Sequence, residues 1–275
     1  TSACSTSALP MAAAVAILIS SLALLISGND PVEAFREMWK TIDSTQSVVI
    51  IVNTAVPYYI AGVAVAIGFK MNLFNIGVEG QYLLGAFFGA AAGGAIAPPG
   101  FLHVLFIIFV AMAVGSLWAG FAGLLKTTRG INEVISTIML NAVATSGIVA
   151  WLSVEWREGE LSTNSGTKLI EESGHIFDLN WLVEIFTRDI LRGRRLSGML
   201  LIAAIIGVAF HLFVNRSRAG FDLRASGYNP LAARAGGVPP KRMVMMAMLL
   251  SGAVAGLVGM VDILTRNHRY DQNFT

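Results

Sequence analysis

The residues best suited to chemistry are Asn75, Glu79 and Gln81, which lie in a polar cluster between apolar runs at residues 47–69 and 82–97. A charge at the centre of a bilayer costs about 3 kcal/mol, so such groups normally face a protein interior, a water-filled path or the membrane interface. Two glycines within the cluster allow the backbone to bend. The cluster predicts either a bend that lines a translocation path or an interfacial turn in which Glu79 stabilises the start of the next helix.

A second polar stretch opens with Asn132 and Glu133 and ends with Asn141, inside an apolar run. Asn132 and Glu133 are residue types that cap the first turn of a helix. Asn141 lies well inside the expected span, where a buried amide needs hydrogen-bond partners. Hydrogen bonding between helices and contact with a substrate are both open for Asn141.

The third stretch is a basic connection at residues 215–242. Asn229 can cap a helix whose first residue is Pro230, and consecutive glycines at 236–237 would end it. A short capped helix of this kind suits docking into a groove on a soluble partner. The alternative is a solvated loop whose cations only set the topology. Against the single acid Asp222, the connection carries Arg216, Arg218, Arg224, Arg234, Lys241 and Arg242.

The composition is that of a membrane protein. Of 275 residues, 55% are hydrophobic and 13% charged, with a mean hydropathy of +0.68, whereas soluble domains carry about 25% charged residues. The net charge of +2 is too small to indicate nucleic acid as a partner. A single cysteine and four scattered histidines give no disulfide framework and no metal-ligand spacing. The sequence also contains no P-loop, no HExxH and no convincing GxSxG motif. We therefore expect no metal, no cofactor and no catalytic residue, and any ATP hydrolysis must come from a separate partner.

Hydropathy predicts an all-α polytopic membrane protein with about seven spanning helices in a single membrane-spanning domain over residues 1–275. The positive-inside rule places the connection 215–242 in the cytoplasm. It places the segment 154–195 outside, although the end of that segment is basic. Residues 181–186 could form a short interfacial helix. The expected spans are residues 8–27, 47–69, 82–97, 101–125, 131–153, 196–214 and 243–264.

Small residues recur at helical spacing. Two overlapping GxxxG steps at residues 85–93 and another at 252–256 would let helix backbones approach closely. Packing within the chain is favoured over a dedicated dimer face.

Three motifs carry a family resemblance: FNIGVEGQ, NEVISTIMLN and GFDLRASGYNPLAARAGGV. In this order and approximate spacing the chain resembles ABC-transporter inner-membrane permeases of the branched-chain amino acid and simple sugar class. Within that class it looks most like the nucleoside and simple-sugar subgroup. The resemblance covers residues 32–263. Because members of the family continue with further hydrophobic helices, it also implies that this chain is a C-terminally truncated permease.

The resemblance implies a multi-pass protein of the bacterial inner membrane, in contact with membrane lipid. It implies three protein partners: a second permease subunit, a cytoplasmic ABC ATPase, and an extracytoplasmic binding protein or lipoprotein. In the family, the segment similar to 223–237 couples the permease to the ATPase. The coupling candidates are Leu223, Arg224, Gly227, Asn229, Ala232, Arg234 and Gly237. The translocation-path candidates are Asn75, Glu79, Gln81, Asn132, Glu133 and Asn141.

The expected function is that of the permease subunit of an ATP-driven importer for nucleosides or simple sugars. A secondary transporter of a small polar solute and an ABC permease for branched-chain amino acids are the alternatives. An uncharged substrate needs hydrogen bonds and apolar or aromatic walls more than fixed charge. Such groups could come from Asn53, Thr54, Tyr58, Tyr59 and Asn141.

Overall fold

The computed structural model describes residues 3–42, 45–155, 166–186, 195–271 and 274. The chain is helical and contains no strand in these ranges; only two isolated β-bridges join distant residues. The elements, in chain order, are α1 (Ala3–Ile26), α2 (Pro31–Ile42), α3 (Thr45–Lys70), α4 (Val78–Ala95), α5 (Phe101–Arg129), α6 (Glu133–Ala142), η1 (Val143–Val149), α7 (Ala150–Glu155), η2 (Glu172–Gly174), α8 (Asn180–Phe186), α9 (Met199–Arg216), α10 (Arg218–Tyr228), α11 (Pro230–Ala235), α12 (Pro240–Gly256), α13 (Met260–Asp262) and η3 (Ile263–Asn267).

Among the described residues, five helical stretches are long and apolar enough to cross a membrane. The all-α polytopic fold expected from the sequence is thus confirmed. The bent pair 14–26 and 31–40, which turns through 116°, would make a sixth span. The five stretches are Thr45–Lys70, Phe101–Arg129, Glu133–Glu155, Met199–Arg216 and Pro240–Asn267.

The expected count of about seven spans included residues 8–27 and 82–97, which lie in α1 and α4. Neither helix is by itself among the five stretches. α4 begins with Glu79 and Gln81 and is rich in glycine, which lowers its hydropathy. It is instead an interior helix, because most of its side chains are buried by its neighbours.

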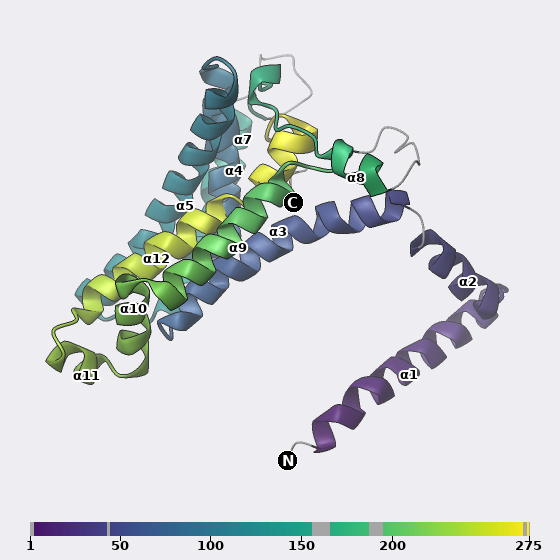
Figure 1. The fold of residues 1–275 in the computed structure, drawn as a ribbon, viewed down its shortest axis with the longest axis horizontal. Coiled ribbons are helices and arrows are strands. Elements are labelled where there is room, and N and C mark those ends of the chain that lie inside the picture. The colour runs from purple at the N-terminus through teal and green to yellow at the C-terminus, as the bar shows by residue number, and fades with distance from the viewer. Residues whose placement is uncertain (1–2, 43–44, 156–165, 187–194, 272–273, 275) are drawn as a thin grey trace.

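α4 lies inside a bundle formed with α3, α5, α9 and α12 (Figure 1). α12 packs against α3, α4 and α5, while α9 packs against α3 and α10. α1 leads away from this bundle, to which α2 connects it. The short helix α8 lies at one end of the bundle, called here the α8 end. α10 and α11 lie at the opposite end, the α11 end.

Three helices meet backbone to backbone at the glycines of the predicted GxxxG steps. A Cβ placed on Gly252 of α12 would lie 2.3 Å from the carbonyl oxygen of Gly115 in α5. A Cβ on Gly85 of α4 would lie 2.8 Å from the carbonyl oxygen of Gly256. Small residues permit this approach where lipid offers no hydrophobic drive between helices. These glycines are therefore used within the chain, as predicted.

We predict that Gly252→Ala destabilises the protein by about 1–3 kcal/mol, because the added methyl group overpacks a backbone contact. The matched control is Gly62→Ala in α3, since nothing lies within 4 Å of a Cβ placed on Gly62. Its effect should be neutral or slightly stabilising, because alanine is the better helix former. Thermal unfolding of the two purified variants in one detergent checks the difference. Equal unfolding temperatures would contradict the close contact.

Candidate functional site

α4 begins deep in the bundle because the chain turns back after α3. The carbonyl oxygen of Gly68 accepts hydrogen bonds from the backbone N–H groups of Met71 and Leu73, and Asn72 adopts φ +57°. The following residues return toward the middle of the bundle, so that Asn75 contacts Ser251 in α12. A helix that starts inside a membrane protein needs protein groups to satisfy its free backbone donors.

Asn75 and Gln81 supply part of this support as a closed pair of amides. The Nδ2 of Asn75 donates to Gln81 Oε1 over 2.9 Å, and the Nε2 of Gln81 donates to Asn75 Oδ1 over 2.8 Å. Asn75 Nδ2 also donates to Ser251 Oγ over 2.8 Å, and Ser251 Oγ donates to the carbonyl oxygen of Ala64 over 2.6 Å. All three polar side chains are buried, with exposures of 2%, 1% and 0% for Asn75, Gln81 and Ser251. We call this group the amide knot.

Asn141 holds the first turn of α4 from the other side. Its Oδ1 accepts the backbone N–H of Gly80 over 2.9 Å, and its Nδ2 donates to the carbonyl oxygen of Ile76 over 2.8 Å. Just beyond Asn141 the helix widens into the π-helical turn η1. A Cβ on Gly80 would lie 2.9 Å from both Asn141 Oδ1 and Ala144 Cβ, so only glycine fits there. Hydrogen bonding between helices therefore accounts for the amide of Asn141.

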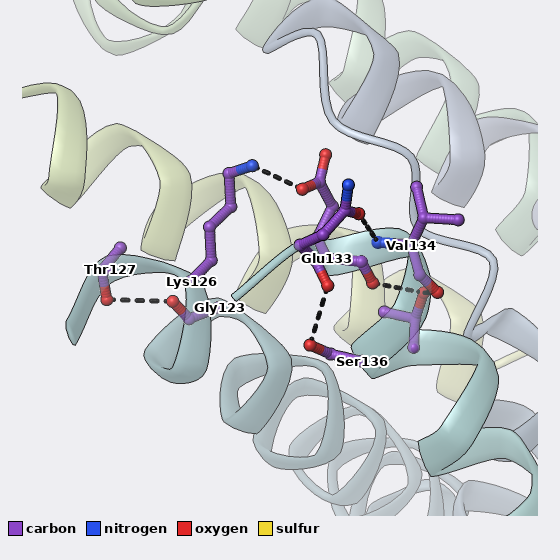
Figure 2. A network of polar contacts seen from close by, with 8 residues as sticks. Gly123, Lys126, Thr127, Glu133, Val134 and Ser136 are labelled. Atoms are coloured by element: carbon purple, nitrogen blue, oxygen red, sulfur yellow. Dashed lines mark hydrogen bonds and ion pairs between the residues drawn. The ribbon is translucent and has the colours of Figure 1, made fainter. Parts of the chain in front are cut away.

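Asn132 and Glu133 organise the α5–α6 turn (Figure 2). Asn132 caps α6, because its side-chain oxygen accepts the N–H of Val134 over 2.8 Å. The carboxylate of Glu133 pairs with the ammonium group of Lys126 in the last turn of α5. Glu133 is buried, so this pair compensates a charge that would otherwise be costly. The capping role expected for Asn132 is what the structure shows.

Glu79 has a different environment from the other five path candidates. It is exposed, with no hydrogen bond or ion pair to any described residue, and it borders a cavity of about 450 Å³ between α3, α4 and the α12–α13 segment. We call this the α3–α4 cavity. Its lining consists of Asn53, Thr54, Pro57, Tyr58, Ala61, Val78, Glu79, Tyr82, Val258, Gly259, Asp262, Arg266 and Phe274.

The polar groups that α3 contributes to this cavity differ in whether they are already hydrogen-bonded to the protein. The side chain of Asn53 is occupied, since it donates to the carbonyl oxygen of Arg195 and accepts from the N–H of Ser197. Its backbone carbonyl lacks the usual helical donor four residues further on, because Pro57 has no N–H. Tyr58 and Thr54 line the cavity as well, whereas the hydroxyl of Tyr59 faces Gly207 of α9.

The cavity ends toward the α8 end in an ion pair that the sequence analysis did not single out. Arg266 Nη1 lies 3.6 Å from Asp262 Oδ1, and both side chains are partly exposed. The spacing of four residues on a helix could have suggested the pair. Its position at the cavity could not be read from the sequence, because it depends on how α13 packs against α4.

Beyond the ion pair, two separate segments are tied together at the α8 end. The N–H of Ile170 donates to the carbonyl oxygen of His268, and the N–H of Thr167 donates to that of Tyr270. The rings of His175 and His268 stack with centroids 3.5 Å apart.

Burial lowers the pKa of His268, and the nearby charges of His175 and Arg195 lower it further. Burial, together with Tyr82 and Asp271, raises the pKa of Tyr270 to about 12. Part of the segment 154–195, at 156–165 and 187–194, lies outside the described residues.

At the α11 end, the coupling candidates divide between two helices. Leu223 in α10 is 1% exposed and packs with Met71, Leu73 and Val244. A Cβ on Gly227 would lie 2.8 Å from the backbone of Met71, so α10 rests directly on the turn before α4. Arg224 is half-buried, and its Nε donates to the carbonyl oxygen of its own helix at Gly220.

α11 is the predicted short capped helix. Its cap Asn229 accepts from the N–H groups of Leu231 and Ala232, Pro230 is its first residue, and Gly237 follows with φ +86°. Ala232 and Arg234 are exposed. Large apolar side chains on the same tip, Tyr228 at 91% and Leu231 at 81% exposed, were not singled out from the sequence. They extend the surface that a partner could cover.

Residues 47–274 match the family model described as branched-chain amino acid transport system / permease component. The chain belongs to this permease family. It is 32% identical to the guanosine ABC transporter permease protein of Bacillus subtilis over 243 residues. This matched region covers 88% of this chain and 67% of that protein. It is therefore a multi-pass permease subunit of the plasma membrane.

Other relatives of the permease are described for different substrates. The glucose ABC transporter permease protein of Haloferax volcanii is 29% identical, over 94% of this chain and 68% of that protein. The nucleoside ABC transporter permease protein of Lactococcus lactis is 28% identical, over 94% of this chain and 69% of that protein. No solved structure matches this chain.

We predict that Asn75→Ala destabilises the permease more than Ser251→Ala. The first change leaves the buried Gln81 amide without its partner, whereas the second leaves the amide pair intact; a stranded buried polar group costs about 1–3 kcal/mol. Asn215→Ala, which removes an exposed amide bonded to His211, is the control and should be near neutral. Unfolding temperatures of the three variants, and a double-mutant cycle between Asn75 and Gln81, check this. Additive effects of Asn75→Ala and Gln81→Ala would disprove the pairing.

Proposed function

We propose that this chain is the permease subunit of an ATP-driven importer for nucleosides or related sugars, and that the α3–α4 cavity receives the substrate. The relatives described for guanosine, nucleosides and glucose support this substrate class. The observation that carries the proposal is a cavity of about 450 Å³ at the start of a buried helix. It is bordered by the carboxylate of Glu79, which has no hydrogen bond or ion pair to a described residue. Ligand pockets have volumes of about 300–1,000 Å³.

The chemistry of the cavity suits a planar, hydroxyl-bearing molecule. Tyr58, Tyr82 and Phe274 offer aromatic surface to a base or a sugar face. Glu79 offers a carboxylate that accepts hydrogen bonds from hydroxyl or ring N–H groups, and a bond to a charged acceptor contributes about 1.5–3 kcal/mol. In this proposal the five other path candidates form the scaffold, since their side chains already bond to the protein. Glu79 is the one path candidate that contacts the substrate, together with the aromatic side chains of the cavity.

A branched-chain amino acid is the second candidate, favoured by one observation. Arg266 and the acids Asp262 and Glu79 border the same cavity, so it offers one cation and two carboxylates to a zwitterion. In that case Arg266 would bind the substrate carboxylate and Glu79 its ammonium group. The experiment on Glu79 distinguishes the two candidates.

The α11 end would face the cytoplasm and the α8 end the outside. The basic connection 215–242 supports this orientation, because cations concentrate on the cytoplasmic side. The acidic first part of residues 154–195 agrees with an outside position for that segment.

The orientation predicts that a cysteine at position 169, introduced as Leu169→Cys after Cys4→Ser, is labelled by an impermeant thiol reagent in intact cells. Labelling only after lysis would refute the outside position.

The proposed partners follow from the family and from the two ends of the bundle. A cytoplasmic ABC ATPase would dock on α11, with Tyr228 and Leu231 as its apolar contacts. A binding protein or lipoprotein would deliver substrate at the α8 end, and a second permease subunit would complete the path. ATP binding then shifts the permease between two arrangements that open the cavity to opposite sides. A docking tip of this kind distinguishes the proposal from a secondary transporter, which has no ATPase to engage.

The packing supports one route from the tip to the cavity. α10 rests on the turn at residues 71–77 through Leu223 and Gly227. That turn leads into the amide knot, and the knot fixes the helix start that carries Glu79. A displacement of α10 by the ATPase would therefore reach Glu79 through one continuous series of contacts.

Glu79→Gln should reduce uptake of labelled nucleoside at least tenfold while membrane levels stay normal, because the carboxylate makes no bond that folding requires. Glu155→Gln, which alters an exposed carboxylate outside the cavity, is the control. If the substrate is instead a branched-chain amino acid, its uptake falls and nucleoside uptake is absent in the unaltered protein. Unchanged uptake of every substrate in Glu79→Gln would refute the assignment of the cavity.

Replacing Ala232 with Trp tests the coupling assignment. The side chain is exposed on α11 and outside the spans, so the protein should insert and reach normal membrane levels. We expect loss of ATPase association and of substrate-stimulated hydrolysis, because the indole would clash with the docking groove. Ala232→Ser, which adds only one atom, should retain both. If Ala232→Trp hydrolyses ATP and takes up substrate at the normal rate, α11 does not dock on the ATPase. The cations of the connection 215–242 then only set the topology.

A further inference from the structure

An open groove at the α11 end lies on the side of the bundle between α5 and α12. Its volume is about 780 Å³. α12 contributes pairs of residues repeated every four positions, at 241–242, 245–246 and 249–250, which is the spacing of one helix face. The first pair is Lys241 and Arg242, and the later pairs are methionines and leucines. A charged end thus passes directly into an apolar floor.

The length of this floor matches one leaflet of a bilayer. Residues 242–250 rise about 12 Å along a helix axis, and half of a hydrocarbon core is about 15 Å. Methionine side chains are flexible and adapt to an irregular partner such as an acyl chain. Lys241 and Arg242 would then lie at the level of the lipid phosphates on the side that we assign to the cytoplasm.

The positive charges of Lys241 and Arg242 are not neutralised by acids among the described residues. In the part of the chain that the structure describes, neither forms an ion pair, and the lining contains no acid. The first turn of α12 also contains no acid, so both cations add to the positive end of the helix dipole. All three contributions attract an anion to this position.

Two hydroxyl groups on the opposite wall define the headgroup further. Thr127 Oγ1 donates to the carbonyl oxygen of Gly123 over 2.9 Å, and Thr128 Oγ1 donates to that of Leu124 over 2.6 Å. Each hydroxyl has one proton, which is used in these bonds, so both oxygens can only accept from a ligand. The wall therefore favours a headgroup that carries a hydrogen-bond donor besides its phosphate.

We propose that this groove binds an acidic phospholipid whose headgroup carries free hydroxyl groups, as in phosphatidylglycerol. Lys241 and Arg242 bind the phosphodiester, Thr127 and Thr128 accept from the headgroup hydroxyls, and the α12 floor holds an acyl chain. Basic pockets between helices on the cytoplasmic side are a known means of binding anionic lipid headgroups. The site is separate from the α3–α4 cavity, with which it shares no lining residue.

Native mass spectrometry of the full chain, purified from membranes and titrated with defined lipids, tests the proposal. We expect phosphatidylglycerol to bind at least tenfold more tightly than phosphatidylcholine. The pair Lys241→Gln and Arg242→Gln should abolish this preference. The matched control is Arg216→Gln with Arg218→Gln, which removes two cations from the same side but outside the groove, and it should retain the preference. The single variant Arg242→Gln should also weaken the preference. It alters the groove alone, because Lys241 but not Arg242 borders a second hollow beside α11.

Two further comparisons identify the ligand. Phosphatidylmethanol has the same charge without the headgroup hydroxyls, and Thr127→Val with Thr128→Val should remove the preference for phosphatidylglycerol over it. Free glycerol phosphate should not compete with the lipid for the groove, since it lacks the acyl chain. If it does compete, the ligand of the groove is a soluble phosphate and not a lipid. Met246→Trp, which fills the floor, should weaken lipid binding with both cations present. Equal binding in the groove and control pairs, or a second protein chain in the groove, would overturn the proposal.

Discussion

The backbone contact between α5 and α12 is the constraint on which the rest of the bundle depends. The carbonyl oxygen of Gly115 and the Cα of Gly252 meet with no room for a side chain. This contact fixes the axial position of α12 against its neighbours. Because Ser251 precedes Gly252, the same contact places the hydroxyl of Ser251 between Asn75 and the carbonyl oxygen of Ala64. Glycine packing, which carries no chemistry, thus sets the geometry of the polar groups.

Those polar groups in turn allow a helix to start inside the bundle. The first donors of α4 would be unsatisfied in a hydrocarbon interior. Asn141 accepts from Gly80, and the carbonyl oxygen of Gly77 accepts from the N–H of Gln81. The amides of Asn75 and Gln81 bond to each other, and the amide of Asn141 bonds to the backbone of Gly80 and Ile76. Glu79, on the same first turn, faces away from this scaffold and toward the cavity.

Local features of the fold could be predicted from the sequence, and long-range pairings could not. The capped helix α11 follows from Asn229, Pro230 and the glycines after it, because capping is decided within a few residues. The sequence also predicts the polar cluster and offers its amides as path candidates, whereas the structure bonds Asn75 to Gln81. Whether an amide faces a path or another amide depends on partners such as Ser251, which is 176 positions away. Sequence periodicity carries no information about such a pairing.

The same limit applies to the coupling segment. The sequence predicts a single coupling segment, whereas the structure divides its residues into buried and exposed members. Leu223 and Gly227 lie against the turn before α4, and Ala232 and Arg234 face outward. The division separates the two helices: α11 exposes most of its side chains, whereas α10 packs on the turn at residues 71–77. The turn at residues 71–77 packs on α10 and also contains Asn75, which bonds to Gln81 in the first turn of α4. Contacts between side chains and backbone are therefore continuous from α10 to the helix start that carries Glu79.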